Sequence, residues 1–200
     1  MKIGAIILAA GFSKRMGSPK VFFPFQGKSM FLHSVELAIQ TELSPIYVVG
    51  GKYIEKMKSD LNGLPVTMIK NEESSEGMST SLKLGVNEAT GKCDAVIVFL
   101  ADQPLVPKAV IGDLIDTYSM YSSDGIKIIR PMYHDIPGHP ILFDTSLFKE
   151  FASIDGDEGG RVIIQCHKQE LKWVHYDDRD WGKDIDTIDD YHWLIRKYGV

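Results

Sequence analysis

The sequence has little cysteine, no long apolar run and no excess of positive charge. Its two cysteines, Cys93 and Cys166, are too few for a disulfide framework and lack a C-x-x-C spacing, so we expect reduced thiols in a reducing compartment. No apolar run approaches the roughly 20 residues that cross a bilayer. The first residues lead directly into strand-like sequence, without the features of a secretory signal. These absences predict a cytoplasmic protein that does not act in a membrane.

The net charge of −5 argues against a broad nucleic-acid-binding surface. The length of 200 residues, with 44% hydrophobic and 24% charged residues, is typical of an ordinary globular chain. We find no repeat or linker, and predict a single domain over residues 1–200. Positive charge gathers near the N-terminus at Lys14, Arg15, Lys20 and Lys28. This cluster predicts a local anion site, and a solvated charged loop is the alternative.

Apolar runs and helix-period patterns alternate along the first half of the chain. The runs with little polar alternation predict strands buried on both faces, at Ile3–Ala9, Ile46–Val49, Val66–Ile69 and Ala95–Leu100. Between them, helical patterns lie at residues 30–39, 78–87 and 110–118. This alternation predicts an α/β protein with a mostly parallel sheet between two layers of helices.

The second half is less regular. We expect further strands at residues 126–130, 140–143 and 171–176, and short helices at 145–152 and 162–167. A last helix should run from about Ile188 to Tyr198, with Asp186 or Thr187 as its cap.

The stretch Ile7–Lys20, ILAAGFSKRMGSPK, combines a strand end with small residues and positive charge. Ligands of parallel sheets bind at the carboxyl ends of the strands, where backbone N–H groups favour anions. The small side chains of Ala9, Ala10 and Gly11 let a phosphate approach the backbone, and Gly11 can adopt a positive φ. Neither the P-loop pattern nor the G-x-G-x-x-G fingerprint fits this stretch. The stretch therefore predicts an extended anion-binding loop, and the missing fingerprint disfavours a dehydrogenase.

Asp102 follows the apolar run 95–101, so it should lie at the same edge of the sheet. Mg²⁺ is commonly held by one or two carboxylates together with phosphate oxygens and water. Asp102 is therefore a candidate metal ligand, although a turn residue before Pro104 would look the same.

Five segments resemble the nucleotidyltransferases related to molybdenum cofactor guanylyl- and cytidylyltransferases. LAAGFSKRMGSPK (residues 8–20) resembles the signature L-A-[AG]-G-x-x-x-R-M-G-x-x-K, and FLADQPLV (99–106) resembles the metal-binding strand end. GHPILF (138–143), GDEGGR (156–161) and DIDTIDDY (184–191) resemble later blocks of the cytidylyltransferase branch. Ile188 replaces a proline that is common in the last block, which leaves the start of that helix open.

The resemblance implies a Rossmann-like, three-layer α/β/α nucleotidyltransferase fold and roles for named residues. It implies Mg²⁺ as the cofactor, held by Asp102 and Asp186, with Asp184 as a neighbouring candidate and a helix cap as the alternative for Asp186. The catalytic residues would be Arg15, Lys20 and Asp102. The nucleotide would bind to Leu8, Ala9, Ala10, Gly11, Arg15, Lys20, Gly77, Ser79 and Ser81. For Ser79, an ordinary helix start is the competing interpretation.

The substrates also follow from the resemblance. Ala10 points to CTP, because the family tends to have glycine there when it uses GTP. The acceptor would be the terminal phosphate of molybdenum-molybdopterin, contacted by His139 and Arg161, and the product would serve a molybdenum hydroxylase such as xanthine dehydrogenase. His139 could equally be a turn residue, and Arg161 could balance its acidic neighbours. The alternatives are a sugar or alditol phosphate as acceptor, GTP as donor, or a nucleotide-binding module without catalysis.

Overall fold

The computed structural model describes residues 1–11 and 18–199. Its main strands are β1 (Ile3–Ala9), β4 (Ile46–Gly50), β5 (Thr67–Lys70), β6 (Ala95–Leu100), β7 (Ile128–Tyr133), β8 (Ile136–Pro137), β9 (Ile141–Asp144) and β10 (Leu171–Tyr176). A separate small hairpin pairs β2 (Pro24–Phe25) with β3 (Lys28–Ser29). The α-helices are α1 (Met30–Gln40), α2 (Ile54–Leu61), α3 (Met78–Ala89), α4 (Lys108–Tyr121), α5 (Arg161–Cys166) and α6 (Ile188–Tyr198). The longest 3-10 helix covers Thr145–Ser153.

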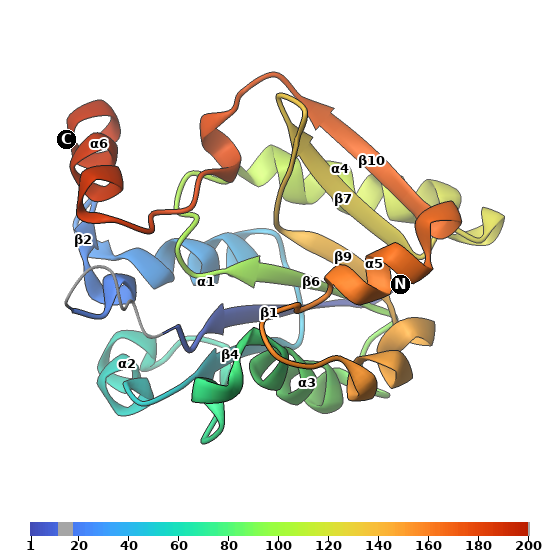
Figure 1. Cartoon of the computed structure of the whole chain (residues 1–200), viewed down its shortest axis with the longest axis horizontal. Coiled ribbons are helices and arrows are strands. Elements are labelled where there is room, and N and C mark those ends of the chain that lie inside the picture. Colours follow the sequence, from blue (N-terminus) through green and yellow to red (C-terminus); the bar gives the residue numbers. More distant parts are fainter. Residues whose placement is uncertain (12–17, 200) are drawn as a thin grey trace.

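The described strands form one mixed sheet in the order β10-β7-β9-β6-β1-β4-β5, with β8 added to β7 (Figure 1). β1, β4, β5 and β6 are parallel, and β10 is parallel to β7. β9 runs antiparallel to both of its neighbours. The sheet is therefore mostly parallel, as predicted, with β9 and the short β8 running in the opposite direction.

Helices cover both faces of the sheet and complete the three-layer fold. α1, α2 and α4 pack on one face, where Phe31, Met57 and Leu114 are fully or almost fully buried. α3, α5 and the 3-10 helix at Thr145–Ser153 pack on the other face. This arrangement confirms the α/β fold class predicted from the alternating pattern.

The predicted positions of β1, β6 and β10 were correct. For β5 a strand was correct, but its predicted burial was wrong. We expected β5 to be buried on both faces, but Thr67 and Lys70 are exposed because β5 is the last strand at its edge. A short strand at an edge carries polar residues without cost, which a buried strand cannot. α2 and the β2–β3 hairpin were not anticipated.

The last helix packs against the N-terminal hairpin rather than against the sheet. Leu194 and the fully buried Ile185 form a small core with Phe25 and Met30. Figure 1 shows α6 standing beside β2 at one end of the molecule. α6 begins at Ile188, as predicted, and Thr187 caps it in a reciprocal capping box with Asp190. The loss of the family's proline therefore leaves the helix start intact, and Asp186 is not the cap.

A membrane-spanning helix was not expected, and none of the helices in the described ranges is long and apolar enough to cross a bilayer.

Candidate active site

The carboxyl ends of β1, β4 and β6 lie level with one another. Ala9 is paired with Gly50 of β4, and Leu8 with Leu100 of β6. The residues that follow β1 and β6 therefore meet at one edge of the sheet, as parallel pairing requires.

A cavity of about 510 Å³ opens at this edge. Eight of the predicted site residues are among the described residues that line it: Leu8, Ala10, Gly11, Lys20, Gly77, Ser81, Asp102 and Asp186. Ala9 is buried in the core beneath it. Gly11 does not use the positive φ that it could adopt. A Cβ at Gly11 would meet no atom of the described residues within 4 Å.

Lys20 lies between the two predicted metal ligands. Its Nζ is 2.5 Å from Asp102 Oδ2 and 2.6 Å from Asp186 Oδ1, and the residue is 9% exposed. Burial disfavours the ammonium, but the two carboxylates outweigh it and raise the pKa of Lys20 above its ordinary value. Lys20 therefore stays positively charged at any physiological pH.

The position of the Lys20 ammonium shows that the space between the two carboxylates accommodates a positive charge. A positive charge already lies within contact distance of oxygens from two carboxylates that are far apart in sequence. Two carboxylates are the usual protein contribution to Mg²⁺, with phosphates and water supplying the rest. No group of three or more metal-ligating side chains occurs in the described residues.

Asp184 shares the cavity wall with Asp186. Desolvation within the cavity, followed by the negative charge of Asp102, raises the pKa of Asp184 to about 6. Three aspartates, Asp102, Asp184 and Asp186, therefore line the same cavity as Lys20.

Ser79 lies at the start of α3 but does not join the described lining of the cavity. It is fully buried, its hydroxyl donates to Asp155 O (2.9 Å), and it accepts from Gly159 N (3.2 Å). The structure therefore gives Ser79 a structural position, and the nucleotide contact predicted for it is replaced by an attachment to the loop at residues 155–159.

Gly77 meets the same loop. Its φ is +118°, and a Cβ there would lie 2.4 Å from Gly156 C and O, so only glycine fits. The close approach expected of Gly77 is made by the protein's own backbone. The loop also carries Asp157 to the cavity, where its Oδ1 accepts from Met78 N at 3.1 Å.

Ser81 is the serine of α3 that reaches the cavity. The buried Asn71 donates to its hydroxyl oxygen at 2.8 Å. Among the described residues the Ser81 hydroxyl donates to no acceptor, so its proton can serve an acceptor on a nucleotide.

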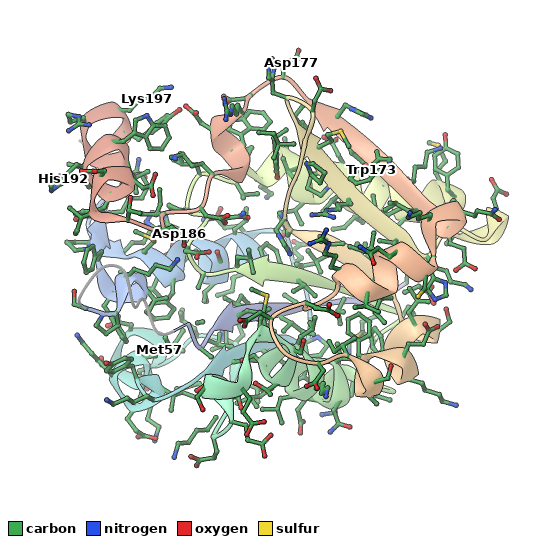
Figure 2. All side chains as sticks on the ribbon, viewed as in Figure 1. Met57, Trp173, Asp177, Asp186, His192 and Lys197 are labelled. Carbon is green, nitrogen blue, oxygen red and sulfur yellow. The ribbon has the colours of Figure 1, made fainter. Side chains whose placement is uncertain are left out.

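A second cavity, of about 700 Å³, lies on the other side of the carboxylates. Asp184, Asp186 and residues of the α6 region line it, together with Tyr133, Ile136, Arg179, Lys183 and Trp193. Figure 2 labels Asp186 on the segment that leads from the sheet to α6. Two cavities that share a wall of carboxylates can hold two reactants side by side.

His139 and Arg161 are outside the described lining of both cavities. His139 is half-buried, and burial followed by the charge of Arg130 lowers its pKa to about 3, so it is neutral. Arg161 is exposed at the start of α5. Burial, and to a smaller extent the positive charge of Arg161, lowers the pKa of Arg130. His139, Arg161 and Arg130 therefore lie near one another. Arg130 donates to Gly138 O at 3.0 Å, and sequence reasoning missed it.

Arg15 is the one predicted site residue that lies outside the described residues.

A mostly parallel sheet carries Lys20 and two carboxylates at its carboxyl edge, and solved nucleotidyltransferases share this fold. Residues 5–172 match the MobA-like NTP transferase domain, and the chain belongs to this family. It is a nucleotidyltransferase, and the resemblance noted in the sequence is confirmed at the level of the family.

Individual relatives differ in their named activities. The molybdenum cofactor cytidylyltransferase of Escherichia coli (strain K12) is 33% identical over 98% of this chain and 97% of that protein. The nicotine blue oxidoreductase of Paenarthrobacter nicotinovorans is 27% identical over 96% of both. The crystal structure of Rv0371c from Mycobacterium tuberculosis H37Rv is 25% identical, with a TM-score of 0.83 over 98% of both chains. A complex of Rv0371c with manganese has a TM-score of 0.78 at 23% identity, over 98% of this chain and 100% of that one.

Proposed function

We propose that the protein transfers CMP from CTP to the terminal phosphate of molybdenum-molybdopterin and releases pyrophosphate. The observation that carries this proposal is the buried Lys20 ammonium between Asp102 and Asp186, where the nucleotide cavity and the second cavity meet. Phosphoryl chemistry depends mainly on positioning and charge neutralisation, and these residues provide both.

Asp102 and Asp186 would hold Mg²⁺, which when bound supplies positive charge to the phosphate oxygens. The Rv0371c complex with manganese supports a divalent cation in this fold. Lys20 would balance negative charge on the triphosphate. No general base is needed, because a phosphate monoester has a second pKa of about 6 and is mostly a dianion at neutral pH.

CTP is the proposed donor because Ala10 lines the nucleotide cavity. A methyl group here narrows the pocket in favour of a pyrimidine, although one methyl group accounts for only about 1 to 3 kcal/mol of discrimination. The 33% identity to a cytidylyltransferase supports the same choice.

The second cavity would receive the acceptor. Arg179 and Lys183 offer positive charge there, and Trp193 offers an aromatic ring, but Lys183 is paired with Asp190 at 2.8 Å. Five aspartates in the lining outnumber the two cations, which favours an acceptor that presents N–H donors beside its phosphate, as a pterin does. Delivery to a molybdenum hydroxylase stays a prediction.

Pyrophosphate release tests the proposal. Purified protein is incubated with Mg²⁺ and molybdenum cofactor, with CTP or GTP, and without acceptor as the control. Release that needs both CTP and the acceptor is expected. If pyrophosphate is released with GTP and acceptor but not with CTP and acceptor, the proposed base is wrong. If it is released only when a sugar or alditol phosphate is the acceptor, the proposed acceptor is wrong. Oxidation of NAD(P)H by the same preparation would favour a redox activity like that named for the Paenarthrobacter relative.

A further inference from the structure

Gln103 connects the two carboxylate-bearing segments of the site. It follows Asp102 and is 5% exposed. Its Nε2 donates to Gly182 O at 3.1 Å and to Asp184 Oδ1 at 2.8 Å. Both N–H bonds of the amide are therefore used on the segment that leads to Asp186.

The other end of the same amide has no partner. Gln103 Oε1 is buried without a hydrogen bond among the described residues, which is uncommon for a buried acceptor. Rotating the amide would not relieve this, because its oxygen would then face the two acceptor oxygens of Gly182 and Asp184. The orientation of the Gln103 amide is thus set by its two hydrogen bonds to Gly182 and Asp184. If the only role of this side chain were packing, an apolar residue would fill the position at lower cost.

The backbone adds a second connection between the same segments. Ile185 N donates to Asp102 O at 3.0 Å, and the Ile185 side chain is fully buried. The backbone bond fixes Ile185, and Gln103 fixes the residues before it. Gln103 is outside the described lining of both cavities, whereas Asp184 and Asp186 belong to both.

We propose that Gln103 is a positioning residue for the cation site. By holding Asp184 and Gly182, it keeps the Asp186 carboxylate at a fixed place opposite Asp102, so that the two carboxylates need not be brought together when a divalent cation binds. This inference rests on the proposed function, in which Asp102 and Asp186 bind that cation. Residues that orient metal ligands commonly change metal affinity by about 10-fold to 100-fold when they are replaced.

Mn²⁺ binding to the full chain in the presence of CTP, measured by electron paramagnetic resonance of free Mn²⁺, tests this directly. Gln103→Met keeps the length of the side chain and removes both donors, and about tenfold weaker Mn²⁺ binding is expected. Gln169→Met, at an exposed glutamine far along the chain, is the matched control and should bind like the wild type. Wild-type affinity in Gln103→Met would overturn the proposal.

Gln103→Glu separates position from charge. An added negative charge would by itself attract Mn²⁺ more strongly. A carboxylate facing Gly182 O and Asp184 would instead push the segment away, so the proposal expects weaker binding. Stronger binding in Gln103→Glu would show that charge outweighs position and would overturn the role assigned to the hydrogen bonds. Far-UV circular dichroism identifies any variant that fails to fold, and the other variant then decides.

A double-mutant cycle with Asp184→Ala locates the coupling. If Gln103 acts through Asp184, Gln103→Met should weaken Mn²⁺ binding by about threefold or less in the Asp184→Ala background. A full tenfold effect in that background would overturn the link. Failure of the wild-type protein itself to bind Mn²⁺ with CTP would reject the proposed function, whereas equal binding by wild type and Gln103 variants would reject only the role of Gln103.

Discussion

Lys20 holds together two carboxylates that would otherwise repel one another. Lys20→Met should therefore lower turnover by about 100-fold to 1,000-fold, the usual effect of losing a charged group that stabilises a transition state. The same variant removes the ammonium that lies between Asp102 and Asp186, so added Mg²⁺ should raise its thermal midpoint more than it raises that of the wild type.

Pyrophosphate release and thermal unfolding measure these two effects. Lys108→Met, at an exposed position at the start of α4, should match the wild type in both. Wild-type turnover in Lys20→Met would remove Lys20 from the mechanism.

His167 should make a small, pH-dependent contribution to stability. A hydrogen bond to Glu150, together with a second one to Glu170, outweighs burial and raises the pKa of His167 above its ordinary value. A raised pKa in the folded state stabilises the fold below the unfolded pKa of about 6.5, and this stability is lost as the pH rises through the folded pKa.

The network is partly exposed, so His167→Gln should lower the free energy of unfolding by about 0.5 kcal/mol at pH 6 and by less at pH 9. Urea unfolding at the two pH values measures this, with the exposed His175→Gln as the control. An equal loss at both pH values would mean that packing, and not charge, links His167 to its neighbours.

Some site residues were predictable one at a time, and others were not. Lys20 and Asp102 follow local signals, namely a loop after a strand and a carboxylate at a strand end. The positions of Ser79 and Gln103 depend on segments about 80 residues away, and no periodicity or spacing within their own segments reports those partners. The same reason hid Asp157, whose partner Met78 is 79 residues away.

At the scale of elements, the two serines at the start of α3 have different surroundings: Ser79 bonds to the loop at residues 155–159, and Ser81 lines the cavity. Ser79→Ala should leave the buried Gly159 N–H without an acceptor and lower the free energy of unfolding by about 1 to 3 kcal/mol. Ser81→Ala should have a smaller effect on stability and should raise the KM for CTP, because Ser81 lines the cavity.

Thermal unfolding and steady-state kinetics of both variants make the comparison, each variant serving as the control for the other. A raised KM in Ser79→Ala with unchanged stability would restore the nucleotide contact first predicted for it.

The elements themselves were largely readable from sequence. Apolar runs gave β1 and β6 because strands of a covered parallel sheet are buried on both faces. α2 was missed although Ile54, Met57 and Leu61 recur at a helical spacing, because the helix is short and its other residues are polar. The reversal of β9 was also hidden, since strand direction depends on connections and not on the residues within the strand.

At the scale of the whole molecule, ligand binding should appear as stability. CTP with Mg²⁺, at about 100 times its Kd, should add about 2.7 kcal/mol. For a chain of this size that corresponds to a rise in the thermal midpoint of about 5 to 10 °C.

A thermal scan with CTP, GTP or UTP, each with and without Mg²⁺, measures this shift. The largest rise is expected for CTP with Mg²⁺, and removal of the metal by a chelator should abolish most of it. An equal rise with all three nucleotides would mean that the base is not recognised.

The packing of Ile185 and Leu194 against Phe25 and Met30 has a consequence for synthesis. A growing chain that has emerged only as far as Asp102 carries Lys20 but lacks Asp186, which pairs with Lys20 across 166 residues of sequence. The two carboxylates meet only after the α6 region has left the ribosome and docked on the N-terminal hairpin. If they bind the cation as proposed, an unfinished chain cannot consume nucleotide.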